Sequence, residues 1–158
     1  MKLARTIRLD ESDINVFDPA ADSGEWAISG AFEFSNWTEA ELTGKARQAF
    51  ANGWLSLEGF GRATFVAVTA ITEAERETLV NSLAARFVTH FGAPSLAAAL
   101  PVAEEEIRHM QEMCEDQADN TLLVVSRELT DIGVKEQFRY IEAQNADLDA
   151  FAVHGSVD

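Results

Sequence analysis

The segment Ala63–Ile71, with the sequence ATFVAVTAI, is the feature that most constrains the fold of this chain. Because apolar residues occupy both alternating faces, a strand built from it has to be covered on both sides. It runs directly into Thr72-Glu73-Ala74-Glu75, a capping box in which the threonine and the second glutamate satisfy backbone N–H groups at a helix start. The sequence therefore predicts a central strand that passes straight into a helix.

Hydrophobic periodicity predicts the remaining elements. We expect strands at 3–9, 14–17, 25–34, 54–57, 62–71, 121–129 and 134–142. Helices are expected after the caps at Thr38 and Thr72 and over 95–117, where Pro101 either interrupts or restarts the helix. This order is not the strict alternation of a doubly wound fold. We therefore predict an α+β protein with a mainly antiparallel sheet and about three helices packed on one face. Ala63–Ile71 and Thr121–Leu129 are expected as interior strands.

Length and hydropathy predict a single domain over residues 1–143, followed by a flexible acidic tail at 144–158. The chain has 158 residues, of which 47% are hydrophobic, enough for one core. No apolar run approaches the roughly 20 residues that cross a bilayer. Charges scattered through residues 1–8 leave no hydrophobic region of a signal peptide, so we expect a cytoplasmic protein.

The net charge of −15 restricts the classes of partner. Nucleic-acid binding depends on lysine and arginine that neutralise phosphates, and only 12 basic residues stand against 27 acidic ones here. From Glu104 to Asp119 there are seven acidic residues and one arginine. We expect no binding to nucleic acid or to an anionic membrane.

Four residues of the last predicted helix form the best candidate metal site: Glu105, His109, Glu112 and Asp116. Their spacing places them within about 60° of arc on a helix. Carboxylates and one imidazole can hold a divalent ion, so the alternative function is a small metal- or ligand-binding enzyme that uses this face. Glu106 with His109 also forms the Glu-x-x-His motif of di-iron bundles, but such a site needs the motif twice.

An apolar stripe on the same helix favours a simpler interpretation. The stripe consists of Ala103, Ile107, Met110 and Cys114. It lies about 200° from the acidic residues, which would then face solvent. We therefore prefer to interpret Glu105, His109, Glu112 and Asp116 as a solvated helix face.

No catalytic residue and no cofactor are predicted. The segment Gly59-Phe60-Gly61-Arg62 can be an anion-binding loop, but a hairpin turn explains its glycines better. Cys114 is the only cysteine, which excludes an internal disulfide, and its acidic neighbours predict an inert core thiol.

Aromatic residues on the predicted strands suggest self-association. The rings concerned are those of Trp26, Phe32, Phe34, Trp37, Trp54, Phe138 and Tyr140. If helices cover one face of the sheet, some of these rings lie on the other face, and an exposed apolar patch marks an interface. We predict a homodimer, with the alternative that the rings build the core.

Three segments carry a resemblance to known sequences: 42–50 (LTGKARQAF), 60–68 (FGRATFVAV) and 120–123 (NTLL). They resemble a family of short acidic bacterial proteins of unassigned function, with similarity from about Leu3 to about Tyr140. None of the segments is a catalytic signature, so no site residues carry over. The resemblance implies an accessory role linked to the maturation of redox enzymes. We therefore predict a non-enzymatic interaction or accessory protein with a protein partner.

Overall fold

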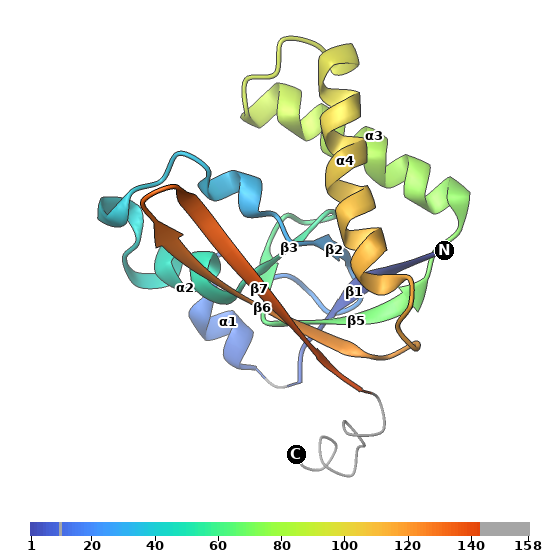
Figure 1. The fold of residues 1–158 in the computed structure, drawn as a ribbon, viewed down its shortest axis with the longest axis horizontal. Helices are drawn as coiled ribbons and strands as arrows, with labels where there is room; N and C mark the ends of the chain where they lie inside the picture. Colours follow the sequence, from blue (N-terminus) through green and yellow to red (C-terminus); the bar gives the residue numbers. More distant parts are fainter. Residues whose placement is uncertain (10, 143–158) are drawn as a thin grey trace.

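The computed structural model describes residues 1–9 and 11–142, and its centre is a seven-stranded antiparallel sheet (Figure 1). The strand order is β4-β3-β2-β1-β5-β6-β7. The strands are β1 (Lys2–Ile7), β2 (Trp26–Ile28), β3 (Trp54–Ser56), β4 (Arg62–Ala63), β5 (Phe65–Ala70), β6 (Leu122–Thr130) and β7 (Gly133–Ile141). This confirms the predicted α+β class and the antiparallel sheet. The tail predicted at 144–158 lies outside the described residues.

The two strands predicted for the interior of the sheet are there. β5 pairs with β1 on one side, from Lys2↔Ala70 to Ile7↔Phe65, and with β6 on the other. β6 in turn pairs along its whole length with β7. Continuous apolar character therefore correctly identified β5 and β6 as strands with neighbours on both sides.

The helices are α1 (Ser12–Val16), α2 (Gly44–Asn52), α3 (Glu73–His90) and α4 (Leu96–Cys114), with 3₁₀ segments η1 (Ala31–Phe34) and η2 (Glu39–Glu41). α3 and α4 pack on one another as a hairpin that projects from the sheet, and α4 also contacts β1 and β2 (Figure 1). α2 packs against β6 at the other end of the molecule. None of the helices in the described part of the chain is long and apolar enough to cross a membrane.

The core forms where α3 and α4 meet the sheet. The predicted stripe of α4 is buried at all four of its positions, as are five apolar residues of α3. Pro101 lies inside α4 and does not interrupt it. Ala97 and Pro101 are both exposed, so water can reach the backbone carbonyl that loses its hydrogen-bond donor at this proline.

The prediction of a strand at Ile14–Phe17 is wrong, because this segment belongs mainly to α1. A tertiary contact holds it there. The buried carboxylate of Asp13 accepts hydrogen bonds from the Thr64 backbone N–H (3.2 Å) and hydroxyl (2.7 Å), at the junction of β4 and β5. The anchor is 51 residues away in sequence, beyond the reach of local periodicity.

The predicted strand at 25–34 is shorter than expected, and so is the helix after Thr38. β2 ends at Ile28, and Gly30 then takes φ +74° and leads into η1. A Cβ atom at Gly30 would collide with Leu55 of β3, so both backbone and space require glycine. The cap at Thr38 starts only η2, and α2 begins at Gly44 because Leu42 leaves the helical region to join the buried cluster of Phe34 and Phe50.

Candidate functional site

The acidic face predicted as a metal site lies on the outer side of α4 and just beyond its end. Glu105, His109, Glu112 and Asp116 are all exposed. Arg108 forms ion pairs with both Glu105 and Glu112, and the His109 ring lies 6.1 Å from the ring of Phe138 on β7. Arg108 thus occupies the space between two of the carboxylates, and the His109 ring packs on β7, so the four side chains do not converge on one point.

The di-iron motif has no counterpart in the structure either. Glu106 is half-buried, and burial raises the pKa of its carboxyl group. The charge of Glu136 raises this pKa further, whereas His109 lowers it. Among residues 1–9 and 11–142, no group of three or more His, Cys, Asp or Glu side chains is arranged to hold a metal ion. The α4 face presents charge to solvent.

Zinc or manganese should leave the melting temperature of the protein unchanged. Ligands that bind only the folded state raise the melting temperature by mass action, and these four side chains offer no common binding point. Differential scanning fluorimetry with each ion checks this, with His109→Ala as the matched variant. A rise that disappears in His109→Ala would instead establish a metal site on α4.

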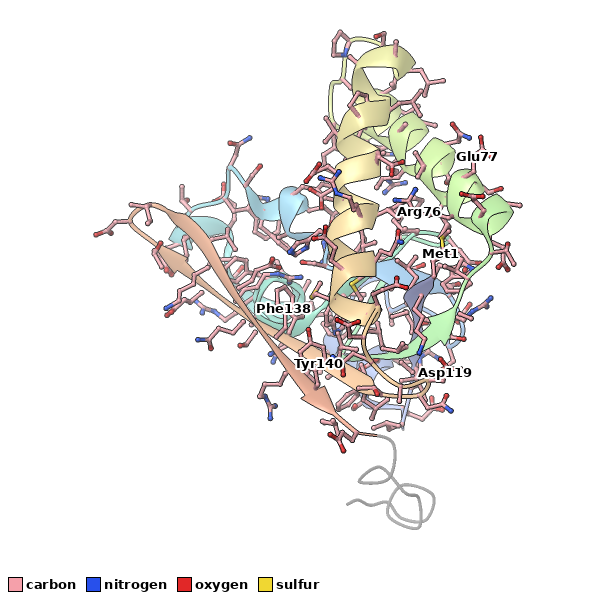
Figure 2. The ribbon with its side chains drawn as sticks, turned by 45° about the vertical axis from the view of Figure 1, so that its right-hand side comes forward. Met1, Arg76, Glu77, Asp119, Phe138 and Tyr140 are labelled. Carbon is pink, nitrogen blue, oxygen red and sulfur yellow. The ribbon has the colours of Figure 1, made fainter. Side chains whose placement is uncertain are left out.

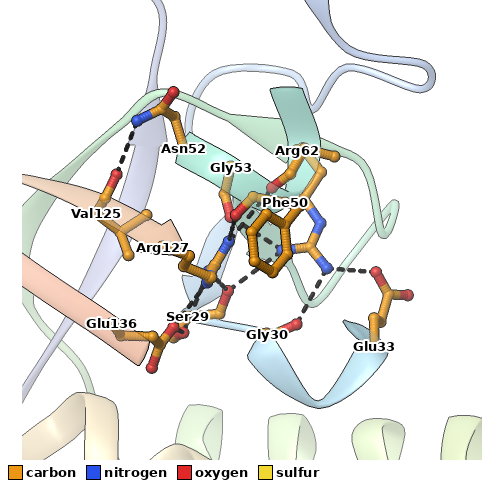
Figure 3. A network of polar contacts seen from close by, with 11 residues as sticks. Ser29, Gly30, Glu33, Phe50, Asn52, Gly53, Arg62, Val125, Arg127 and Glu136 are labelled. Carbon is orange, nitrogen blue, oxygen red and sulfur yellow. Dashed lines mark hydrogen bonds and ion pairs between the residues drawn. The ribbon is translucent and has the colours of Figure 1, made fainter. Parts of the chain in front are cut away.

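A buried polar network joins the sheet to α2 and η1, and two arginines form its centre (Figure 3). Arg62 donates to the carbonyls of Gly53 (2.9 Å) and Gly30 (3.1 Å) and pairs with Glu33. The guanidinium of Arg62 therefore already has partners within the protein. Gly59-Phe60-Gly61 lies in the connection between β3 and β4. The anion-loop interpretation finds no support here.

Arg127 of β6 is the second arginine of the network. Its guanidinium donates to Glu136 of β7 (2.7 Å) and to the carbonyls of Phe50 (2.8 Å) and Ser29 (2.6 Å). Burial lowers the pKa of Arg62 to about 10. The positive charge of Arg127 acts in the same direction, and the negative charge of Glu33 acts against it. Burial also lowers the pKa of Arg127, against the attraction of Glu136. All of these contacts are made between groups of the chain itself, so the network ties β4, β6 and β7 to α2 and η1.

Most of the aromatic rings that motivated the homodimer prediction lie in the cores. Trp26, Phe34 and Trp54 are buried, and three more rings are partly buried against the two hydrophobic clusters. Tyr140 is exposed on β7 (Figure 2). The homodimer stays a prediction. Most of the aromatic rings proposed for its interface pack inside the protein instead.

Cys114 is fully buried at the end of α4. Burial, reinforced by Glu115, raises the pKa of its thiol to about 12. Since the thiolate is the reactive form, Cys114 is a core residue and not a nucleophile.

The far end of the α3–α4 hairpin exposes apolar side chains. Residues 91–103, which we call the hairpin tip, contain no charged residue although the whole chain carries a charge of −15. Phe91, Leu96 and Val102 are 42%, 48% and 51% exposed. Periodicity did not single out the tip, although its signal, thirteen uncharged residues in an acidic chain, is present in the sequence.

An open groove of about 1200 Å³ continues from the tip along α3 and α4. Its apolar lining includes Val80, Leu100 and Met1, and its polar lining includes Arg76 of α3 (Figure 2). Arg76 joins the two helices through two hydrogen bonds to Glu104 (2.6 and 3.1 Å). These bonds lower the pKa of Glu104. This bidentate contact therefore links α3 to α4 within the groove.

Fold and surface together define a small α+β protein whose most distinctive exposed feature is the tip and groove of a helical hairpin. The chain belongs to a family of unknown function (DUF6505), whose model matches residues 1–158. This confirms the resemblance to a family of unassigned function. Neither a curated protein nor a solved structure matches the chain.

Proposed function

We propose that this protein is a non-enzymatic accessory protein that binds another protein through the hairpin tip. The observation that carries the proposal is the exposure of Leu96 and Val102 within an uncharged segment of a strongly acidic chain. Large apolar side chains exposed close together on a surface mark a protein interface. Arg62 and Arg127 are hydrogen-bonded within the protein, and Cys114 is buried. None of the three is placed to react with a substrate, which supports a non-enzymatic role.

The partner is a redox enzyme or one of its maturation factors, as the sequence resemblance implies. A charge of −15 keeps the protein soluble and steers it toward partners with basic surfaces. An accessory protein of this kind binds its partner without turnover of its own.

Replacing Leu96 by glutamate should abolish recovery of the partner from the native host. A charge in the middle of an apolar contact has to be desolvated without a counter-charge, which costs several kcal/mol. Tagged wild-type protein and Leu96→Glu are used as bait, and the recovered proteins are compared by mass spectrometry. Leu96 is the first residue of α4, where glutamate also suits the helix dipole, so the fold is retained.

Ile132→Glu is the matched control, because Ile132 is 98% exposed in the turn between β6 and β7, away from the hairpin. The control should recover the same proteins as the wild type. Equal recovery by Leu96→Glu and by wild type would contradict binding through the tip.

A further inference from the structure

The side-chain charges along the groove are not evenly neutralised. Arg76 is held by Glu104 and by Gln111 (2.7 Å), and Arg108 is held by Glu105 and Glu112. Glu73 and Glu77 also line the groove, and within the described residues neither has an ion pair. The net unneutralised side-chain charge of the groove is therefore negative and belongs to α3.

Glu73 and Glu77 are four residues apart on α3, so they lie one above the other on the same side of the helix. Both are exposed, while Val80 is buried and Leu100 half-buried beside them. The groove thus combines an apolar floor with an anionic rim along one wall. A ligand that fills it needs apolar side chains on one side and cationic side chains on an adjacent side.

The size of the groove points to a polypeptide ligand. Small-molecule sites are enclosed cavities of roughly 300–1,000 Å³ that bury most of the ligand. The groove exceeds that range at about 1200 Å³ and opens along two helices. An amphipathic helix laid into a groove between helices is a common recognition mode of this shape.

We propose that the groove binds a cationic amphipathic helix of the partner protein. Its apolar side chains lie on the floor formed by Val80 and Leu100, and its lysine or arginine side chains pair with Glu73 and Glu77. This inference rests on the proposed function and adds the chemical class of the partner segment.

Charge argues against occupants from the chain itself. Residues 73–119, which include both helices, contain ten acidic residues and three basic ones, a net charge of −7. A second copy brings the same surface and a total charge of −15. The C-terminal segment 143–158 has three aspartates and no lysine or arginine. A partner of opposite sign is the complementary one.

The probe is a fluorescein-labelled synthetic amphipathic helix with leucine on one face and lysine on the other. Fluorescence anisotropy should show binding to the full chain that weakens as salt rises, since exposed charge pairs are screened. The same peptide with glutamate in place of lysine should not bind. Glu73→Gln combined with Glu77→Gln should weaken binding of the lysine peptide by about fivefold to tenfold.

Glu11→Gln combined with Asp131→Asn is the matched control. It removes the same net charge from exposed positions in the turn before α1 and the turn after β6, and binding should change less than about twofold. Equal weakening by the two double variants would overturn the proposal, because general attraction would then explain the binding. Binding of the glutamate peptide would overturn it as well.

The experiment also separates this inference from the proposed function. If Leu96→Glu loses the host partner while the Glu73/Glu77 variant keeps it and does not weaken the lysine peptide, the tip binds a partner and the cationic helix is wrong. If Leu96→Glu keeps the partner, the proposed function fails. In that case the peptide-binding measurements still test the groove separately.

Discussion

Replacing Arg127 by methionine should lower the free energy of unfolding by about 3–5 kcal/mol, because it leaves the largely buried carboxylate of Glu136 without its cationic partner. The Arg127 side chain is fully buried and supplies donors to Glu136, Ser29, Ala49 and Phe50. Methionine has a similar length but no donor, so three backbone carbonyls also lose a hydrogen bond. Urea denaturation followed by circular dichroism measures the change.

Two further variants locate the cause of this loss. Arg47→Met is the control, since Arg47 is 59% exposed in its ion pair with Glu39 and its loss should cost less than about 1 kcal/mol. Adding Glu136→Gln to Arg127→Met should recover part of the stability, because the unpaired charge is removed. A loss below about 1 kcal/mol for Arg127→Met would show that the network contributes little to the fold.

Replacing Trp54 by alanine should also lower the free energy of unfolding by about 3–5 kcal/mol, because a large cavity remains in the core. Trp54 on β3 is fully buried, and its ring lies 5.8 Å from that of Phe138 on β7. β3 and β7 stand far apart in the strand order, so this contact shows that the sheet curls and brings the two strands together. Chemical denaturation again measures the change.

Trp54→Phe is the matched variant. It keeps an aromatic ring against Phe138 and removes the indole Nε1–H, which has no hydrogen-bond partner in the described part of the protein. The loss should therefore be about 1 kcal/mol, well below that of alanine. Equal losses for the two variants would show that the indole itself, and not the filled volume, is what Trp54 contributes.

Several elements could be predicted from the sequence because local physics decides them. The cap at Thr72 forms as expected, with Glu75 N donating to the threonine hydroxyl at 3.1 Å. The apolar stripe of α4 is buried at each predicted position, and β5 and β6 lie inside the sheet. In each case the signal is a repeat or motif within a few turns or residues, and burial follows directly from it.

The candidate surface was only partly predictable. The uncharged segment 91–103 is visible in the sequence, but its exposure depends on how far α3 and α4 project beyond the sheet. The groove needs both helices side by side, and the contact between Arg76 and Glu104 that links them joins residues 28 positions apart in the chain. The acidic face of α4 has the spacing of a metal site, yet Arg108 neutralises Glu105 and Glu112, and the His109 ring packs against Phe138.

Alternation and capping act between near neighbours, so the fold class, β5 and β6 and the long helices could be predicted from residues close together in the chain. The positions at which the chain leaves those patterns depend on contacts between distant segments. Asp13 accepts a hydrogen bond from Thr64, and Gly30 lies against the Leu55 side chain. Arg127 donates to backbone carbonyls 77 to 98 residues away in sequence. Burying a polar group requires a partner, and that partner can come from any part of the chain. Contacts of this kind leave no periodic trace in the sequence, so only the folded arrangement reveals them.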